Sequence, residues 1–550
     1  MTREEHAHPG AWTELSSAAV VHGIRVTTAP PSRDAVPVMT WAQARDLAAE
    51  LIPAATGDDP DARAVAVRRL EQLDGRSWLL LDEAARPAGH ATARFPLNPA
   101  AGWPTDVVTS WHGDGHLRQR ATRMLAGHEG RVAVSALAVR LLDHVPQVRE
   151  EAWRALLPRL DAHHADAVLD VLLAGRERRR APAAVDRVRD TLLDRHPASE
   201  LVSSLLRSDR PGVRRWAFAF GHERGLLTAE QLLTAVHRDQ DQWIRATCAE
   251  WLVEVTQPAG LRPLLTAKSV VARLVALTRV PDEALADDDL VRALADRSPA
   301  VREQAQWRAR RRGIDAADRY RDRLRTPAPP VHALAGCLHG LVEVGGSADL
   351  PVFTACLGHP SARVRAAAVT GVGTFAARGE ALALLEPMLL DPSPRVGTTA
   401  ATTLVRLGAP RAATDAAWVS AQPWSRRAAW RVDRGRGSWD RVEADLRAAD
   451  DDDPRLAALG LVGIRNWLVT KSATTWANLP DTQRRRIQQA VAAVALDDTT
   501  RRTLAFHVGI DRPPPPAPVR RDGPAPVAAP SRPARRWPRL LRRRPGKGRP

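Results

Sequence analysis

Apolar residues recur along most of the chain at spacings of three and four, the pattern of helices with one buried face. Residues 283–295 and 299–311 show it most clearly, as two amphipathic segments separated by a turn that holds Asp296 and Pro299. Proline is tolerated in the first turn of a helix, because the amide there has no intrahelical partner. The pattern therefore predicts two helices joined by a short turn, with Val301 and Ala305 on the buried face of the second.

A phrase built on this turn returns along the chain: Asp, four residues, Val or Ile, then usually Arg and, a few residues later, Ala. The apolar position of the phrase recurs after 65 and 31 residues from Val148 to Val213 and Ile244, and after 63 and 32 residues from Val301 to Val364 and Val396. The shorter spacings give a period of about 32, and the longer ones are about two periods. Self-similarity at such a period is typical of a solenoid of stacked helix pairs. A solenoid presents a long surface, so the default expectation is that it binds a partner.

Departures from the period set the predicted domain boundaries. We expect an irregular leader over 1–35, degenerate helical repeats over 36–112, a regular array over 113–508 and a disordered basic tail over 509–550. Residues 74–112 are the least repeat-like part of the body, 468–480 interrupt the period, and 483–496 form the expected final helix that caps the array. Twelve prolines among the last 39 residues favour a solvated extension over a helix.

Over roughly residues 113–508 the array resembles the HEAT-repeat family of armadillo-like proteins, including its bacterial members. The family places an Asp in the turn and a basic residue six positions later, and these join neighbouring repeats in a ladder. The spacing is met by Asp143/Arg149, Asp239/Arg245 and Asp296/Arg302. The resemblance implies an all-α fold, a right-handed superhelix of helix pairs.

Two repeats depart from the family pattern. Arg365 follows His359 and Pro360 where the acid would stand, and Asp391 is followed by Gly397 where the Arg belongs. We expect the ladder to be weakened near residue 397, which could mark a bend. The ladder arginines, including Arg118, Arg149 and Arg214, are expected to form structural ion pairs and are poor candidates for a binding site.

The net charge of +17 is concentrated at one end of the chain, because residues 512–550 contain twelve Arg or Lys and one Asp. Basicity is therefore weak evidence about the body and stronger evidence about the tail. Three widely spaced cysteines suggest neither disulfides nor a metal site. No apolar stretch approaches the ~18 residues of a membrane helix, so we expect a cytoplasmic protein.

Tryptophan is the candidate contact residue of the body, with 17 copies against one tyrosine. Counted at 100° per residue from the core position, Trp216 and Trp251 point inward, whereas Trp243 and Trp307 fall off the apolar face. Second helices line the concave face of HEAT arrays, so the resemblance implies that Trp243 and Trp307 contact a partner or pack between repeats.

The tail supplies the other candidates. A cationic cluster with apolar anchors suits RNA, DNA or an anionic membrane surface, and a solvated terminus without a fixed role is the alternative; the residues concerned are Arg535, Arg536, Trp537, Arg539, Arg542, Arg543 and Arg544.

Enzymatic chemistry has little support in the sequence. Pairs of His and Glu at His128-Glu129 and His222-Glu223 invite comparison with HEAT-type deoxyhypusine hydroxylases, which bind iron through four such pairs, but only two occur here. Asp241 and Trp243 invite comparison with HEAT-like alkylpurine DNA glycosylases on one short segment. We predict no catalytic residues, no metal and no cofactor.

The sequence therefore predicts a non-enzymatic scaffold that binds a protein partner along its concave face, with the basic tail as a second contact. The alternative is a nucleic-acid-binding HEAT-like protein, and a HEAT-like DNA glycosylase comes third. A continuous stripe of Arg and Trp on the concave side would favour nucleic acid, and a mixed-charge groove would favour protein. The partner's identity and the oligomeric state are not predicted.

Overall fold

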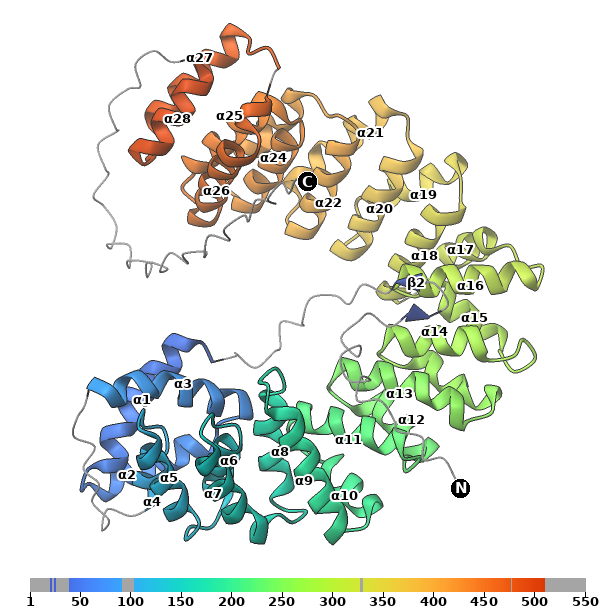
Figure 1. Cartoon of the computed structure of the whole chain (residues 1–550). Coiled ribbons are helices and arrows are strands. Elements are labelled where there is room, and N and C mark those ends of the chain that lie inside the picture. Colours follow the sequence, from blue (N-terminus) through green and yellow to red (C-terminus); the bar gives the residue numbers. More distant parts are fainter. Residues whose placement is uncertain are drawn as a thin grey trace, which may run out of the picture. The chain divides into compact units, whose positions relative to one another are not determined.

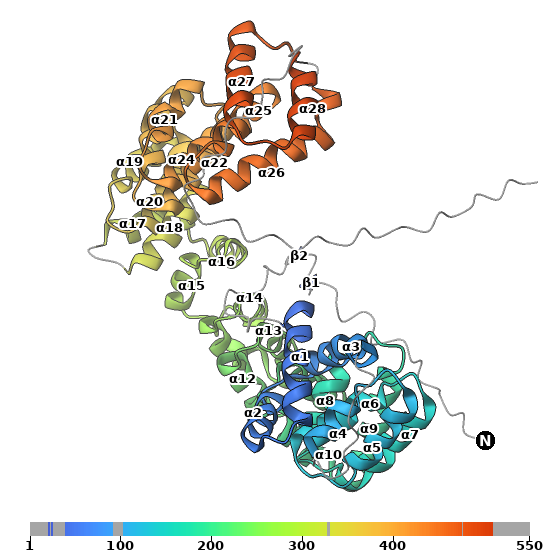
Figure 2. The ribbon, with the colours of Figure 1, turned by 90° about the vertical axis from the view of Figure 1, so that its left-hand side faces the viewer.

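Short helices make up nearly all of the ordered chain. The computed structural model describes residues 20–21, 24–25, 39–91, 103–326, 330–475 and 477–509. They fall into two compact units, Met1–Ala286 and Asp287–Pro550, and each unit is considered by itself (Figures 1 and 2).

The first unit contains fourteen α-helices, two short 3-10 helices and one small β-ladder among its described residues. Its elements are β1 (Val20–Val21), β2 (Ile24–Arg25), α1 (Trp41–Thr56), α2 (Pro60–Glu71), α3 (Gly75–Ala91), α4 (Trp103–Thr109), α5 (Gly115–Leu125), α6 (Arg131–Leu141), α7 (Pro146–Leu156), η1 (Leu157–Arg159), α8 (Ala165–Ala174), α9 (Ala181–Arg195), α10 (Ala198–Leu205), α11 (Pro211–Glu223), α12 (Ala229–Arg238), α13 (Gln242–Val255), η2 (Pro258–Thr266) and α14 (Val270–Arg279).

The second unit is built in the same way. Its described elements are α15 (Asp287–Leu294), α16 (Pro299–Arg311), α17 (Ala316–Arg325), α18 (Val331–Val344), η3 (Ser347–Asp349), α19 (Leu350–Cys356), α20 (Ala362–Phe375), α21 (Arg378–Leu385), η4 (Pro387–Leu390), α22 (Pro394–Arg406), η5 (Arg411–Thr414), α23 (Asp415–Trp418), α24 (Pro423–Gly435), α25 (Ser438–Ala449), α26 (Pro454–Thr470), η6 (Ser472–Thr474), α27 (Asp481–Ala493) and α28 (Asp498–Val508).

The predicted helix–turn–helix unit is present where the sequence showed it best. The predicted helix over 299–311 coincides with α16, and Val301 and Ala305 are buried on it. The helix expected over 283–295 begins only at Asp287. Proline opens six of the second helices, as a residue without an amide hydrogen should; these helices are α7, α11, α16, α22, α24 and α26.

Glycine lets the second helices of the second unit approach closely. Helices α18, α20, α22 and α24 pack successively, each against the next. A Cβ on Gly373 would lie 2.1 Å from Cγ2 of Thr403, and one on Gly435 would lie 2.6 Å from Cγ2 of Val405. Larger residues at these positions would push neighbouring helices apart, so the layer of second helices is tight and continuous.

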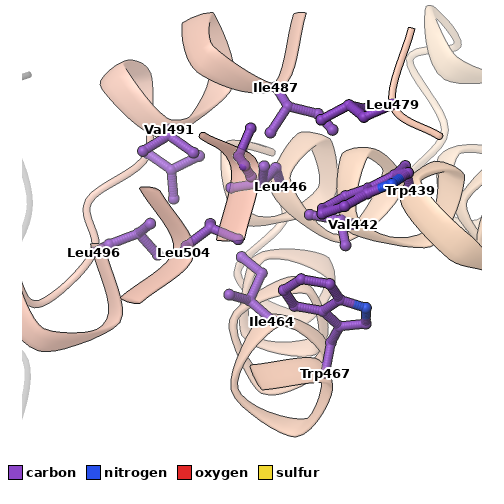
Figure 3. Close-up of a cluster of buried hydrophobic side chains, with 12 residues drawn as sticks. Trp439, Val442, Leu446, Ile464, Trp467, Leu479, Ile487, Val491, Leu496 and Leu504 are labelled. Atoms are coloured by element: carbon purple, nitrogen blue, oxygen red, sulfur yellow. The ribbon is translucent and has the colours of Figure 1, made fainter. Parts of the chain in front are cut away.

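The C-terminal end of the array has its own apolar core (Figure 3). Side chains from α25, α26, α27 and α28 converge there, and the rings of Trp439 and Trp467 lie 5.5 Å apart. The segment expected to be the final helix is α27. That expectation is wrong, because α28 follows it and contributes the buried Leu504 and Val508 to the same core.

Two features near the N-terminus lie in segments that the sequence pattern left poorly defined. The segment 74–112, expected to be the least repeat-like, contains the long helix α3, in which Trp78 and Leu81 are buried. The leader expected to be irregular contains the two-residue ladder of β1 and β2, in which Val20 pairs with Arg25. The rest of that leader lies outside the described residues, as does the tail from residue 510 onward.

The predicted all-α solenoid of helix pairs is confirmed. Across the described residues, no helix is long and apolar enough to cross a membrane.

Candidate partner-binding surface

The recurring arginine binds its own turn through the backbone. In eight helices its Nη1 donates to the carbonyl oxygen of the residue six positions earlier, whatever side chain that residue carries; the arginines are Arg118, Arg149, Arg214, Arg245, Arg273, Arg302, Arg365 and Arg426. Arg149, for example, donates to Asp143 O at 2.8 Å. The spacing of six therefore reflects the reach of the guanidinium to its own turn, and the ion pair predicted between Asp143 and Arg149 is wrong.

The Asp carboxylate of the turn instead accepts from an arginine of the preceding repeat. Rungs of this kind include Arg118–Asp143, Arg214–Asp239, Arg365–Asp391 and Arg426–Asp451, with Nε to carboxylate distances of 2.8, 3.2, 2.7 and 2.8 Å. Each rung is bidentate, because Nη2 reaches the second carboxylate oxygen. The ladder between repeats is present, but its partners lie 25 or 26 residues apart.

The two departures from the family pattern fit this geometry. Arg365 lacks an acid in its own turn, yet it forms a full rung with Asp391 of the next repeat. Gly397 has no side chain with which to form a rung to the following repeat. In that repeat Ser420 occupies the place of the turn Asp. Trp424 Nε1 donates to Asp391 O at 3.1 Å across this junction, and Arg431 Nη1 donates to Thr398 Oγ1 at 2.7 Å.

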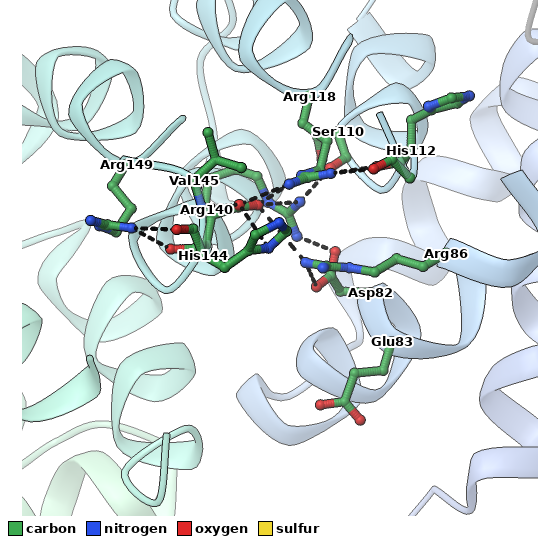
Figure 4. Close-up of polar contacts among 12 residues, drawn as sticks. Asp82, Glu83, Arg86, Ser110, His112, Arg118, Arg140, His144, Val145 and Arg149 are labelled. Carbon is green, nitrogen blue, oxygen red and sulfur yellow. Dashed lines mark hydrogen bonds and ion pairs between the residues drawn. The ribbon is translucent and has the colours of Figure 1, made fainter. Parts of the chain in front are cut away.

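The first rung belongs to a larger buried network (Figure 4). Arg140 and Asp143 are 0% and 2% exposed, and Arg140 forms ion pairs with Asp143 and Asp82. Burial alone would raise the pKa of Asp143, but the hydrogen bonds from Arg118 and the attraction of Arg140 hold that pKa at about 2. These charges stabilise the fold and are not free to bind a ligand.

A different set of arginines faces outward in the second unit. Helices α20, α22, α24 and α26 carry ten arginines and one acid, Asp433, which is buried. Four exposed members, Arg363, Arg395, Arg431 and Arg455, form no ion pair with any described residue. We call the exposed side of these four helices the arginine face.

Three of the four share one position. Arg363, Arg395 and Arg455 are each the second residue of their helix, and Trp424 holds the same place in α24. No acidic residue occupies the first turn of any of these helices. Because a helix N-terminus carries partial positive charge, an unpaired arginine there lowers helix stability slightly. The placement of these arginines therefore has no stabilising reason within the fold.

Aliphatic side chains continue the arginine face on its last helix. Leu459, Val462 and Val469 of α26 are 40%, 52% and 85% exposed. They follow Arg455 at spacings of 4, 7 and 14, which places them on the same side of the helix as that arginine. The last second helix of the array thus exposes both a cation and an apolar stripe.

The two tryptophans predicted to lie off the core do so to different degrees. Trp307 is 42% exposed, and Arg311 stacks over its ring at 4.8 Å. Trp243 is partly buried and meets Trp251 edge to face at 6.2 Å. Trp216 is buried as expected, but Trp251 is only partly buried, and its ring stacks on His222 at 4.2 Å. The tail candidates from Arg535 to Arg544 lie outside the described residues.

The other candidate sites do not assemble. His128 bonds to Asp106 at 2.8 Å and His222 approaches Glu254 at 3.6 Å, so the two His-Glu pairs have separate local partners. Nowhere in the described part of the chain do three His, Cys, Asp or Glu side chains gather as a metal site would require. Cys248 and Cys337 are buried thiols.

The structure brings forward residues that the sequence analysis missed. Arg363, Arg395, Arg431 and Arg455 were not predicted as contact residues, because spacing alone does not distinguish them from the ladder arginines. The signal was present in the sequence: α20, α22 and α26 contain no Asp or Glu at all.

The fold and its rungs define an α-helical repeat protein. Residues 350–432, which span α19 to α24, match the family model of HEAT repeats, and the predicted resemblance is confirmed there. A search of curated proteins found no match.

Solved structures similar to this chain include several karyopherins. Importin beta shares 11% identity with a TM-score of 0.39, covering 86% of this chain and 69% of that one. Kap95p, in a structure concerned with RanGDP, shares 12% with a TM-score of 0.36 and coverages of 86% and 70%. Kap121p bound to Pho4p shares 12% with a TM-score of 0.28, and this chain spans 55% of its length.

Proposed function

We propose that this protein is a non-enzymatic scaffold that holds a protein partner on the arginine face of α20, α22, α24 and α26. The observation that carries the proposal is the contrast between two sets of arginines. The ladder arginines spend their donors on neighbouring repeats and turns, whereas Arg363, Arg395, Arg431 and Arg455 are exposed and form no ion pair with the described residues.

The form of the surface also favours binding over catalysis. A row of second helices offers an extended contact area, which is the general use of solenoids. The basic tail would add a second contact, raising the local concentration of a partner that the array then holds. That contact would involve the arginines of residues 512–550.

The test compares affinity capture by the full chain and by two matched double variants. Arg363→Glu/Arg395→Glu removes two cations of the arginine face. Arg319→Glu/Arg485→Glu changes the net charge equally on α17 and α27, where these arginines are exposed and form no ion pair with described residues. We expect a set of proteins that the wild type and the control retain, and that the first variant loses, with or without nuclease.

Two outcomes would contradict the proposal. Retention of the same proteins by all three forms would show that the arginine face is not used. Loss of all retained proteins after nuclease would show that nucleic acid mediates the capture. A chain lacking residues 512–550 measures the tail separately and should retain the same proteins more weakly.

A further inference from the structure

From the chemistry of the arginine face we infer that its ligand is an acidic polypeptide segment with aliphatic side chains. This inference rests on the proposed function and deepens it by naming the kind of partner. It depends on three features of α20, α22, α24 and α26: cations that form no ion pair with described residues, no exposed acid within these helices, and an aliphatic stripe next to the cations.

The cations define the charge of the ligand. Arg363, Arg395 and Arg455 occupy equivalent helix positions, so they repeat from one second helix to another as a line across the face. Arg431 lies two turns further along α24, at the place that Val462 holds in α26. The described residues of these helices carry no exposed acid, so an anion meets little repulsion beside Arg363 and Arg395; only Arg455 has exposed carboxylates nearby, in the turn before α26. Charge complementarity therefore requires a ligand with several negative groups.

Charge alone fits a polypeptide or a nucleic acid, and the aromatic residues favour the polypeptide. A single-stranded nucleic acid gains much of its affinity by stacking bases on exposed rings. On the arginine face Trp430 and Trp467 are buried. Trp424 is partly buried, and its indole N–H is used by Asp391 O. A continuous stripe of Arg and Trp would indicate nucleic acid. The arginine face has the arginines of such a stripe but lacks accessible tryptophan rings among its described residues.

The aliphatic stripe points the same way. Leu459, Val462 and Val469 are exposed, and they offer no contact to the sugar-phosphate backbone of a nucleic acid and no flat ring for its bases to stack on. A peptide that alternates carboxylates with leucine-like side chains would cover them and release ordered water. The last helix, which exposes Arg455 beside Leu459, would recognise both features of such a peptide.

The size of the face sets the length of the probe. Four second helices at about 10 Å from axis to axis span about 30 Å. An extended peptide covers about 3.3 Å per residue, so about ten residues are enough. A suitable probe is a fluorescein-labelled peptide of Glu-Glu-Leu repeats about twelve residues long, with oligoglutamate and oligothymidine of matched charge as comparisons.

The experiment measures the fluorescence anisotropy of each probe as protein is added. The protein is truncated after residue 511, so that the basic tail does not contribute. We expect the Glu-Glu-Leu peptide to bind most tightly. Arg363→Glu/Arg395→Glu should weaken it about tenfold, and the control Arg319→Glu/Arg485→Glu less than about twofold. Leu459→Ser/Val462→Ser should weaken the Glu-Glu-Leu peptide about fivefold and leave oligoglutamate unchanged.

Each contrary result has a definite meaning. Tighter binding of oligothymidine, indifferent to Leu459→Ser/Val462→Ser, overturns the peptide assignment in favour of nucleic acid. No binding of any probe also overturns it. If protein capture nevertheless depends on Arg363 and Arg395, the scaffold role stands and the partner has another chemistry. If capture is unchanged in Arg363→Glu/Arg395→Glu, both proposals are wrong.

Discussion

Second helices chosen from the two units differ in how their charges are balanced. In the first unit, Glu151 of α7 pairs with Arg123 at 3.2 Å, Glu150 lies 3.6 Å from Arg187, and Asp241 at the start of α13 pairs with Arg215 at 2.8 Å. In the second unit, α20, α22 and α26 carry arginines and no acids. These first-unit charges are balanced by neighbouring side chains, whereas α20, α22 and α26 leave Arg363, Arg395 and Arg455 without an ion pair among the described residues.

The same repeat can therefore serve stability or recognition, depending on whether its arginines have partners. Arg118 and Arg140 lie in a buried network with Asp82 and Asp143, where their charges are fully engaged. Arg363 and Arg395 stand at helix N-termini, where their charge opposes the helix dipole. Variants that move charge in each unit should separate these two uses.

The largest effect is expected from Asp143→Ala in the first unit. It leaves Arg118 and Arg140 buried without their shared carboxylate, and losing one partner of a buried ion pair costs about 3–5 kcal/mol. Asp391→Ala breaks one rung of the second unit, where Arg365 is closer to solvent, and should cost about 1.5–3 kcal/mol. Chemical unfolding followed by circular dichroism measures both, and equal losses would contradict the difference between the units.

Acid should remove the same contribution from the wild type. The pKa of Asp143 is about 2 in the folded state and ordinarily about 3.8, so its ionised form is favoured by folding. That stabilisation, on the order of 2 kcal/mol, is fully present above about pH 5 and is lost as the pH falls through the folded-state pKa of about 2.

Asp143→Asn serves as the control for this pH dependence, since an amide does not titrate in that range. The difference in unfolding free energy between wild type and Asp143→Asn should shrink steadily from pH 4 to pH 2. A difference that stays constant over this range would mean that Asp143 is not the titrating group.

Adding a rung should stabilise the second unit. A Cβ on Gly397 would lie 3.5 Å from Leu389 O and 3.8 Å from Ala428 Cβ, so a side chain fits there. Gly397→Arg with Ser420→Asp supplies both halves of a rung and should add about 1–2 kcal/mol, part of it from helix propensity. Gly397→Ala isolates the propensity part, and a double variant no more stable than Gly397→Ala would show that no rung forms.

The smallest effect is a gain in stability from reversing an arginine of the arginine face. Arg363→Glu and Arg395→Glu each place an anion in the first turn of a helix and should stabilise by about 0.3–1 kcal/mol. Arg485→Glu, near the middle of α27, should change stability less. Thermal unfolding measures the shift. A loss of stability in Arg363→Glu would mean that this arginine supports the fold after all.

The repeat period, the opening prolines and the boundaries of the best-patterned helix were predictable because they depend on local spacing. The helix over 299–311 needed only the position of Pro299 and the three-to-four spacing from Val301. The final helix α28 was not predicted, because its burial depends on a core shared with α25, α26 and α27.

The partners of the arginines could not be derived from spacing. A residue pair six apart suggested a contact within one turn, but the carboxylate of Asp143 faces the preceding helix and its backbone carbonyl faces Arg149. The packing of one repeat on the next determines whether an arginine binds the carboxylate or the backbone carbonyl of the Asp. The arginine face was hidden for the same reason, since exposure follows from packing.

The rungs also have a consequence for how the array opens. In these four rungs, the residue six positions after the Asp forms no further rung among the described residues. Arg149 and Arg245 donate only to backbone carbonyl oxygens, and Gly397 and Ala457 have no side-chain donor. These four bidentate links join α5 to α7, α11 to α13, α20 to α22 and α24 to α26. Local unfolding should follow these couples, so that hydrogen exchange proceeds in blocks of two repeats, with α5 and α7 in one block and α20 and α22 in another.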